Sequence, residues 1–121
     1  TRTLHIVQNK NYDIPEPNIS NRSWNLIQKY MSKVVTAPQG TGRLSNPKIP
    51  GLKIWGKTGT AENPHGEPHA WYIAYGEKDG EMISVVILLE NGGHGGEMAT
   101  PLARNVFKHY FNSNRTKLAK N

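Results

Sequence analysis

Four consecutive residues near the middle of the chain combine a cation, two hydroxyl groups and a glycine: Lys57, Thr58, Gly59 and Thr60. An ammonium group and hydroxyl donors at this spacing could hold an anionic group of a substrate. Gly59 removes a side chain at a point where a substrate backbone could approach closely. Residues 55–61 therefore predict either an active-site strand that binds an anion or a polar turn at the end of a strand.

A second cluster of reactive side chains follows directly. His65 and His69 lie four residues apart, close to Glu62, a spacing that invites interpretation as a metal site. The prolines and the glycine within 64–68 predict a loop, however, so the two imidazoles would not share one face of a helix. We therefore predict no metal site and no cofactor.

Composition limits the other interpretations. The chain has 121 residues, of which 36% are hydrophobic, a low value that indicates one domain or part of one. The formal net charge of +6 permits an anionic partner. The basic residues cluster only within 113–121, and we interpret this segment as a solvated basic tail that follows a domain over 1–112. Cysteine is absent, which excludes disulfide and thiol chemistry, and the start at Thr1 without Met suggests a fragment.

The pattern of apolar and turn-forming residues predicts an α+β fold, an antiparallel meander flanked by helices. Ser20 or Asn21 can cap a first helix, Asp79-Gly80 marks a tight turn, and Pro101 suits the first turn of a closing helix. The predicted elements are helix 21–36, loop 37–51, strand 52–58, loop 61–68, strand 70–75, strand 82–90, glycine-rich joint 91–96 and helix 97–111.

Burial can be predicted for some of these elements. Residues 3–8 alternate weakly and could form a short strand, while the run 82–90 is apolar enough to predict burial on both faces. The first helix carries an apolar side, formed by Trp24, Ile27, Met31, Val34 and Val35.

The order of these elements and motifs resembles the C-terminal part of the transpeptidase domain of class B penicillin-binding proteins, and most closely the elongation type of the penicillin-binding protein 2 group. The resemblance runs from about Ser23 to Phe111. It is carried by Gly40-Thr41-Gly42, Ile54 to Ala61, Asn63-Pro64, His69-Ala70-Trp71-Tyr72, Glu90-Asn91-Gly92 and Ala99-x-Pro101-Leu102-Ala103. It implies the fold of penicillin-binding transpeptidases and serine β-lactamases.

The family works with three motifs, S-x-x-K, S-x-N and K-T-G, and only the third is credible here. Ser45 and Lys48 have the first spacing, but Pro47 between them excludes the required helix. Ser23-Trp24-Asn25 has the second spacing, but it lies in the first turn of the predicted helix, where a capping serine is ordinary. The resemblance thus implies that the nucleophilic serine and the second motif lie outside this chain.

The resemblance also implies roles for the K-T-G-T residues in acyl transfer to peptidoglycan stem peptides. Lys57 would face the nucleophile and attract the substrate carboxylate, and the Thr58 and Thr60 hydroxyls would bind that carboxylate. Gly59 would let the substrate lie alongside as an added strand, and the Thr60 N–H would donate to the oxyanion. Two further residues would shape the floor of the site, His69 and Trp71.

For the whole protein the resemblance implies an anchor in the cytoplasmic (inner) membrane and a catalytic domain on the periplasmic or outer side. Its partners would be stem peptides, β-lactams, the remainder of the domain, a lipid-linked peptidoglycan polymerase and shape-determining scaffold proteins. Two alternatives stay open. One is a serine β-lactamase-like hydrolase, and the other is a basic module that binds an anionic polymer, although the chain contains no nucleic-acid motif.

Overall fold

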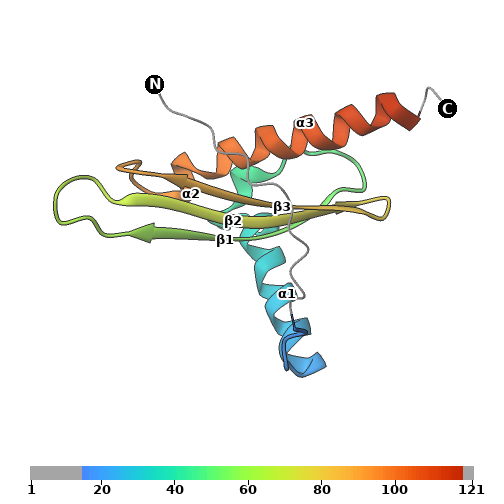
Figure 1. Ribbon diagram of the computed structural model, residues 1–121, viewed down its shortest axis with the longest axis horizontal. Coiled ribbons are helices and arrows are strands. Elements are labelled where there is room, and N and C mark those ends of the chain that lie inside the picture. The colour runs from blue at the N-terminus through green and yellow to red at the C-terminus, as the bar shows by residue number, and fades with distance from the viewer. Residues whose placement is uncertain (1–14, 119–121) are drawn as a thin grey trace.

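The computed structural model describes residues 15–118, with side chains described as far as 113. The first helix, α1, spans Asn21–Thr36 and is followed by a short 3₁₀ turn, η1 (Arg43–Ser45). Three strands come next: β1 (Lys53–Ala61), β2 (His69–Lys78) and β3 (Glu81–Leu89). The short helix α2 (Gly95–Met98) leads into the closing helix α3 (Thr100–Leu118) (Figure 1). The strand expected over 3–8 lies outside the described residues.

The three strands form one antiparallel sheet in the order β1-β2-β3. The α+β meander predicted from the sequence is thus confirmed. Asp79 and Gly80 make the tight β2–β3 turn with φ angles of +55° and +80°, as the Asp-Gly pair predicts. The β1–β2 connection is the longer loop 62–68. At its two ends Ala61 pairs with His69, and Thr60 pairs with Ala70.

One face of the sheet, the helix-covered face, packs against α3 (Figure 1). Phe107 is fully buried there, and Gly76 leaves room for its ring, since an added Cβ would lie 2.8 Å from Phe107 Cε1. The buried core combines this face with α1 and the α2–α3 region. It consists of Val35, Ile54, Ala70, Tyr72, Ala74, Val85, Ala99, Ala103, Phe107 and Phe111.

The opposite face, the open face, carries apolar side chains that the described residues leave exposed. Its members are Trp71, Ile73, Met82, Val86 and Leu88. The prediction that β3 is buried on both faces is therefore wrong for the described part of the chain. Val86 is 64% exposed whereas its neighbour Val85 is 6% exposed, which is the alternation of a strand covered on one face.

Helix α1 has the bounds predicted from the sequence. The Ser20 side chain accepts a hydrogen bond from the Ser23 N–H at the start, and the Ala37 N–H donates to the Lys33 carbonyl at the end. The N-terminal half of the helix lies away from the sheet (Figure 1), so the predicted apolar side is exposed there, at Trp24 and Ile27, and becomes partly buried towards the C-terminal end. Trp24 is 45% exposed, and Val35 near the C-terminal end is the buried residue of the helix.

The chain becomes helical again earlier than expected, at Gly95, and α3 continues to Leu118 rather than ending near 111. Pro101 lies in the first turn of α3, where its missing N–H costs no helical hydrogen bond. Part of the segment interpreted as a basic tail is thus helical, and the boundary at 112 stays a prediction. Within the described residues no helix combines the length and the apolar character needed to cross a bilayer.

Candidate functional site

Lys57, Thr58, Gly59 and Thr60 lie in the second half of β1. In the described part of the chain β1 pairs with β2 on one side, and its other edge has no strand partner. Successive side chains point to opposite faces of the sheet. Lys57 and Gly59 therefore share the open face, and Thr58 and Thr60 share the helix-covered face.

The Lys57 side chain is exposed, and its ammonium donates a hydrogen bond of 2.6 Å to the Thr58 carbonyl oxygen. This contact indicates that the Thr58 carbonyl is directed to the free edge of β1. Backbone groups two residues apart point the same way along a strand, so the Thr60 N–H faces this edge as well. The strand thus presents a cation and a backbone donor at one accessible edge.

Thr58 has a partner that the sequence did not identify. The Thr41 and Thr58 hydroxyl oxygens lie 2.8 Å apart, across 17 positions of sequence. Thr41 is held by the two glycines beside it. The Gly42 N–H donates to the Val34 carbonyl, and a Cβ on Gly40 would lie 2.3 Å from the same oxygen. The Gly-Thr-Gly pattern before the strand was the available signal for this contact.

A buried hydrogen-bond chain supports β1 from the helix-covered face. The Tyr72 hydroxyl lies 2.7 Å from Ser45 Oγ, which donates to the Gly42 carbonyl at 2.8 Å, and both side chains are fully buried. Burial raises the pKa of Tyr72, and the Ser45 hydrogen bond offsets part of that rise. Gly56 provides the space for the phenol, since an added Cβ would lie 2.3 Å from its oxygen.

The two serine patterns do not form nucleophilic sites. Ser45 is inaccessible and hydrogen-bonded on both sides, so it serves to hold the turn after α1. Ser23 lies in the first turn of α1, where its hydroxyl accepts from Ser20 Oγ at 3.0 Å. Within residues 15–118 neither hydroxyl is hydrogen-bonded to a lysine ammonium.

The other two predicted site residues lie on β2. Trp71 is 37% exposed on the open face and pairs with Gly59 across the strands. His69 pairs with Ala61, and its Nδ1 accepts the Asn91 N–H at 2.9 Å. Acceptance at Nδ1 places the ring proton of a neutral imidazole on Nε2. In residues 15–118 no three histidine, cysteine or acidic side chains gather as a metal site would require.

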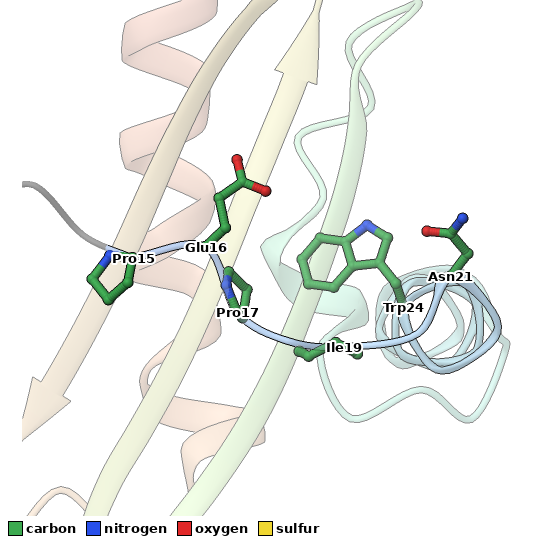
Figure 2. Close-up of a pocket in the computed structure, with 6 residues that line it drawn as sticks. All are labelled: Pro15, Glu16, Pro17, Ile19, Asn21 and Trp24. Atoms are coloured by element: carbon green, nitrogen blue, oxygen red, sulfur yellow. The ribbon is translucent and has the colours of Figure 1, made fainter.

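A hollow of about 420 Å³ lies elsewhere, between the segment before α1 and the first turn of that helix (Figure 2). None of its lining residues belongs to β1 or β2. Apolar side chains form most of its wall, and the lining consists of Pro15, Glu16, Pro17, Ile19, Asn21 and Trp24. The candidate chemistry therefore belongs to the strand edge and not to this hollow.

Comparison with protein families identifies the family to which this strand and its flanking elements belong. The family model for the penicillin binding protein transpeptidase domain matches residues 1–108. The chain belongs to this transpeptidase family. The resemblance predicted from the K-T-G-T strand and its flanking motifs is thereby confirmed.

Individual relatives agree with the transpeptidase family. The chain is 34% identical over 115 residues to peptidoglycan D,D-transpeptidase MrdA of Haemophilus influenzae, covering 83% of this chain and 17% of that protein. It is 42% identical over 69 residues to peptidoglycan D,D-transpeptidase PbpA of Mycobacterium tuberculosis, covering 50% of this chain and 14% of that protein. The matched part thus spans only about a sixth of the MrdA protein and a seventh of the PbpA protein.

A solved structure shows the same fold. Penicillin-binding protein A from M. tuberculosis, solved as an imipenem acyl-enzyme complex, matches with a TM-score of 0.59 and 32% identity. The match covers 77% of this chain and 20% of that one. The predicted fold, the C-terminal portion of a penicillin-binding transpeptidase, is confirmed, and the comparisons favour neither a β-lactamase nor a polymer-binding module.

Proposed function

We propose that this chain is the C-terminal part of a peptidoglycan D,D-transpeptidase, which cross-links stem peptides through an acyl-serine intermediate and binds β-lactams. The observation that carries the proposal is the K-T-G-T sequence on the unpaired edge of β1, with the Lys57 ammonium and the Thr60 N–H on the accessible side. The MrdA and PbpA relatives bear the name of this activity, and the related penicillin-binding protein A was captured as an acyl-enzyme.

Each residue of the strand has a chemical task in this proposal. The Lys57 ammonium attracts the substrate carboxylate and holds the serine of the second motif. Thr58 and Thr60 donate hydroxyl hydrogen bonds to the carboxylate, and Thr41 can orient the Thr58 hydroxyl for this purpose. Gly59 lets the substrate add to the edge as a strand. The Thr60 N–H stabilises the oxyanion, a contribution worth about 10²–10³ in rate for one donor.

His69 and Trp71 complete the site. The Trp71 ring borders Gly59 on the open face, where it can form the floor under a bound stem peptide. The imidazole of His69, the first residue of β2, accepts a hydrogen bond from the Asn91 N–H, so we assign it a role in the shape of the site. We assign neither residue a proton transfer.

The nucleophile of the proposed enzyme comes from another part of the domain. Ser45 is buried and Ser23 belongs to the first turn of α1, so neither can attack a substrate at β1. The finer proposals concern the whole protein: a membrane anchor, a periplasmic catalytic domain, a role in cell elongation, and partnership with a lipid-linked polymerase and scaffold proteins. These rest on the resemblance to the penicillin-binding protein 2 group.

The test is covalent labelling of the complete transpeptidase polypeptide with a fluorescent penicillin, followed by mass spectrometry of the labelled peptide. We expect the label on a serine outside residues 1–121. Lys57→Ala is expected to slow labelling at least about tenfold, because the anionic β-lactam loses its cation. The matched control is Lys53→Ala, which removes a lysine from the same face of β1 four residues earlier and is expected to leave the rate unchanged.

Three outcomes would contradict the proposal. Label on Ser45 or Ser23 would show that the motif assignment is wrong. Equal loss of labelling in the Lys57 and Lys53 variants would show that net charge, and not the K-T-G-T position, attracts the ligand. No labelling of the intact protein at all would overturn the transpeptidase assignment itself.

A further inference from the structure

At one end of the sheet, two segments that are distant in sequence are fastened to each other. One is the β1–β2 loop, residues 62–68, and the other is the Asn-Gly-Gly segment that follows β3. Asn63 Nδ2 donates to Asn91 Oδ1 at 2.6 Å. The Asn91 N–H donates to His69 Nδ1 at 2.9 Å, and the Gly93 N–H donates to the Pro68 carbonyl at 2.9 Å. Two hydrogen bonds therefore join the loop to the segment behind it, and the third joins that segment to His69, the first residue of β2.

Asn91 is suited to this position by its backbone as well as its side chain. Its φ of +53° lies in the left-handed region, which asparagine adopts more readily than most residues. This conformation directs the N–H and the side chain of one residue to two different partners. Gly66 leaves room for the amide, since a Cβ there would lie 2.9 Å from Asn91 Oδ1.

Asn63 connects Asn91 to the rest of the loop through further hydrogen bonds of its side-chain amide. Its Oδ1 accepts the His65 N–H at 3.1 Å, and its Nδ2 also lies 3.4 Å from the Glu67 carbonyl. The amide thus bridges the two sides of the loop while it binds Asn91. Removal of the Asn91 amide would break the bond between the two side chains, and removal of the Asn63 amide would also break the bonds inside the loop, while the Gly93–Pro68 backbone bond would remain in both cases.

The same segment reaches the K-T-G-T strand a few residues later. A Cβ on Gly95 would lie 2.3 Å from the carbonyl oxygens of both Gly59 and Trp71, so the backbone of Gly95 packs directly on this pair. Thr60 lies between Gly59, which Gly95 supports, and Ala61, which pairs with the anchored His69. The segment 91–95 therefore holds the backbone of Thr60 from both sides.

We propose that Asn91 is a positioning residue for the oxyanion donor: through Asn63 and His69 it fixes the end of β1 and so the direction of the Thr60 N–H. This inference rests on the proposed function, because it assigns a task to the Thr60 N–H. As a positioning residue, Asn91 would act through Asn63 and His69 and not by contact with the substrate. Its side-chain contact and its backbone contact can be removed separately, since substitution of Asn91 leaves its N–H in place.

The experiment uses three variants of the complete transpeptidase and benzylpenicillin as the probe. Asn91→Gly removes the amide but keeps a residue that tolerates the left-handed conformation, and Asn63→Ala removes the partner. Asn91→Asp keeps an acceptor for Asn63 Nδ2 and serves as the conservative variant. Stopped-flow acylation at 0.5 M salt, where the added charge is screened, separates the affinity of the first complex from the acylation rate constant.

We expect Asn91→Gly and Asn63→Ala each to lower the acylation rate constant about tenfold, with the affinity of the first complex unchanged. The double variant should be no slower than either single one, because both remove the same contact. Asn91→Asp should keep the acylation rate constant within about threefold of that of the unchanged protein. A merely structural role would lower the melting temperature without this selective loss of rate.

Unchanged acylation in Asn91→Gly and Asn63→Ala would overturn the inference, and so would losses that multiply in the double variant. If one variant fails to fold, the other carries the comparison with Asn91→Asp. Failure of the proposed function has a different signature, because the unchanged protein would then not be acylated at all.

Discussion

Gly56 is the residue whose replacement tests the packing under the candidate site most directly. It lies one position before the K-T-G-T sequence, on the helix-covered face of β1. A Cβ at this position would lie 2.3 Å from the Tyr72 hydroxyl oxygen, 2.7 Å from Cζ and 2.9 Å from Cε2. The phenol cannot retreat freely, because its ring is fully buried and its oxygen is hydrogen-bonded to Ser45.

The expected cost of Gly56→Ala has two parts. Forcing a methyl group into a filled core costs about 1–3 kcal/mol. Displacing the phenol from Ser45 costs about 0.5–1.5 kcal/mol for the hydrogen bond. Alanine in a strand interior stabilises the folded state by roughly 0.5–1 kcal/mol relative to glycine, which offsets part of the loss. We therefore expect the free energy of unfolding to fall by about 0.5–4 kcal/mol.

Urea denaturation of the complete domain, followed by tryptophan fluorescence, measures this change. The matched control is Gly59→Ala on the same strand, where the nearest atom, Trp71 Cβ, lies 3.3 Å from the added Cβ. We expect that control to change stability by less than about 1 kcal/mol. Combining Gly56→Ala with Tyr72→Phe should recover part of the loss, since the closest contact disappears. Equal stability of the Gly56 and Gly59 variants would refute the packing argument.

Two further predictions concern the core and the exposed faces. Burial raises the pKa of the Tyr72 hydroxyl, so as the pH rises the unfolded chain loses this proton first, near pH 10. The folded state keeps the proton to higher pH, and the resulting ionisation of the unfolded chain lowers the free energy of unfolding as the pH rises from about 10 towards the folded pKa. Urea midpoints measured between pH 8 and pH 11.5 should therefore fall less steeply for Tyr72→Phe, and equal slopes would count against the burial argument. Residues 1–121 expressed alone should melt without a cooperative transition in calorimetry, because the open face lacks a cover; a sharp transition would contradict this.

Local sequence signals predicted the elements of the fold well. Helix α1 begins after Ser20, whose side chain caps it, and ends before Pro38, which has no N–H to continue the helical hydrogen bonds. The Asp79-Gly80 pair fixed the β2–β3 hairpin because both residues tolerate positive φ. The burial of β3 was predicted wrongly, since a run of valine, isoleucine and leucine does not reveal how many layers cover a strand.

The support of the site could not be predicted in the same way. The contacts between Thr41 and Thr58, Ser45 and Tyr72, and Asn63 and Asn91 join residues 17, 27 and 28 positions apart. Such pairs depend on the register of the strands and on the path of the loops, which periodicity does not specify. Each nevertheless lies within or beside a short motif that the resemblance had marked: Gly-Thr-Gly, His-Ala-Trp-Tyr and Glu-Asn-Gly.

The exposed faces and the incomplete site have a common explanation in the sheet register. Lys57 pairs with Ile73, and Ile73 pairs with Val86, so one row across the open face runs from the proposed catalytic cation to the most exposed apolar residue of β3. A layer that buries Ile73 and Val86 must pass beside Lys57. In the proposed transpeptidase, one layer can therefore complete the core and bring the nucleophilic serine to the K-T-G-T edge. Weak folding of the isolated segment and its lack of a nucleophile would then follow from the absence of the same layer.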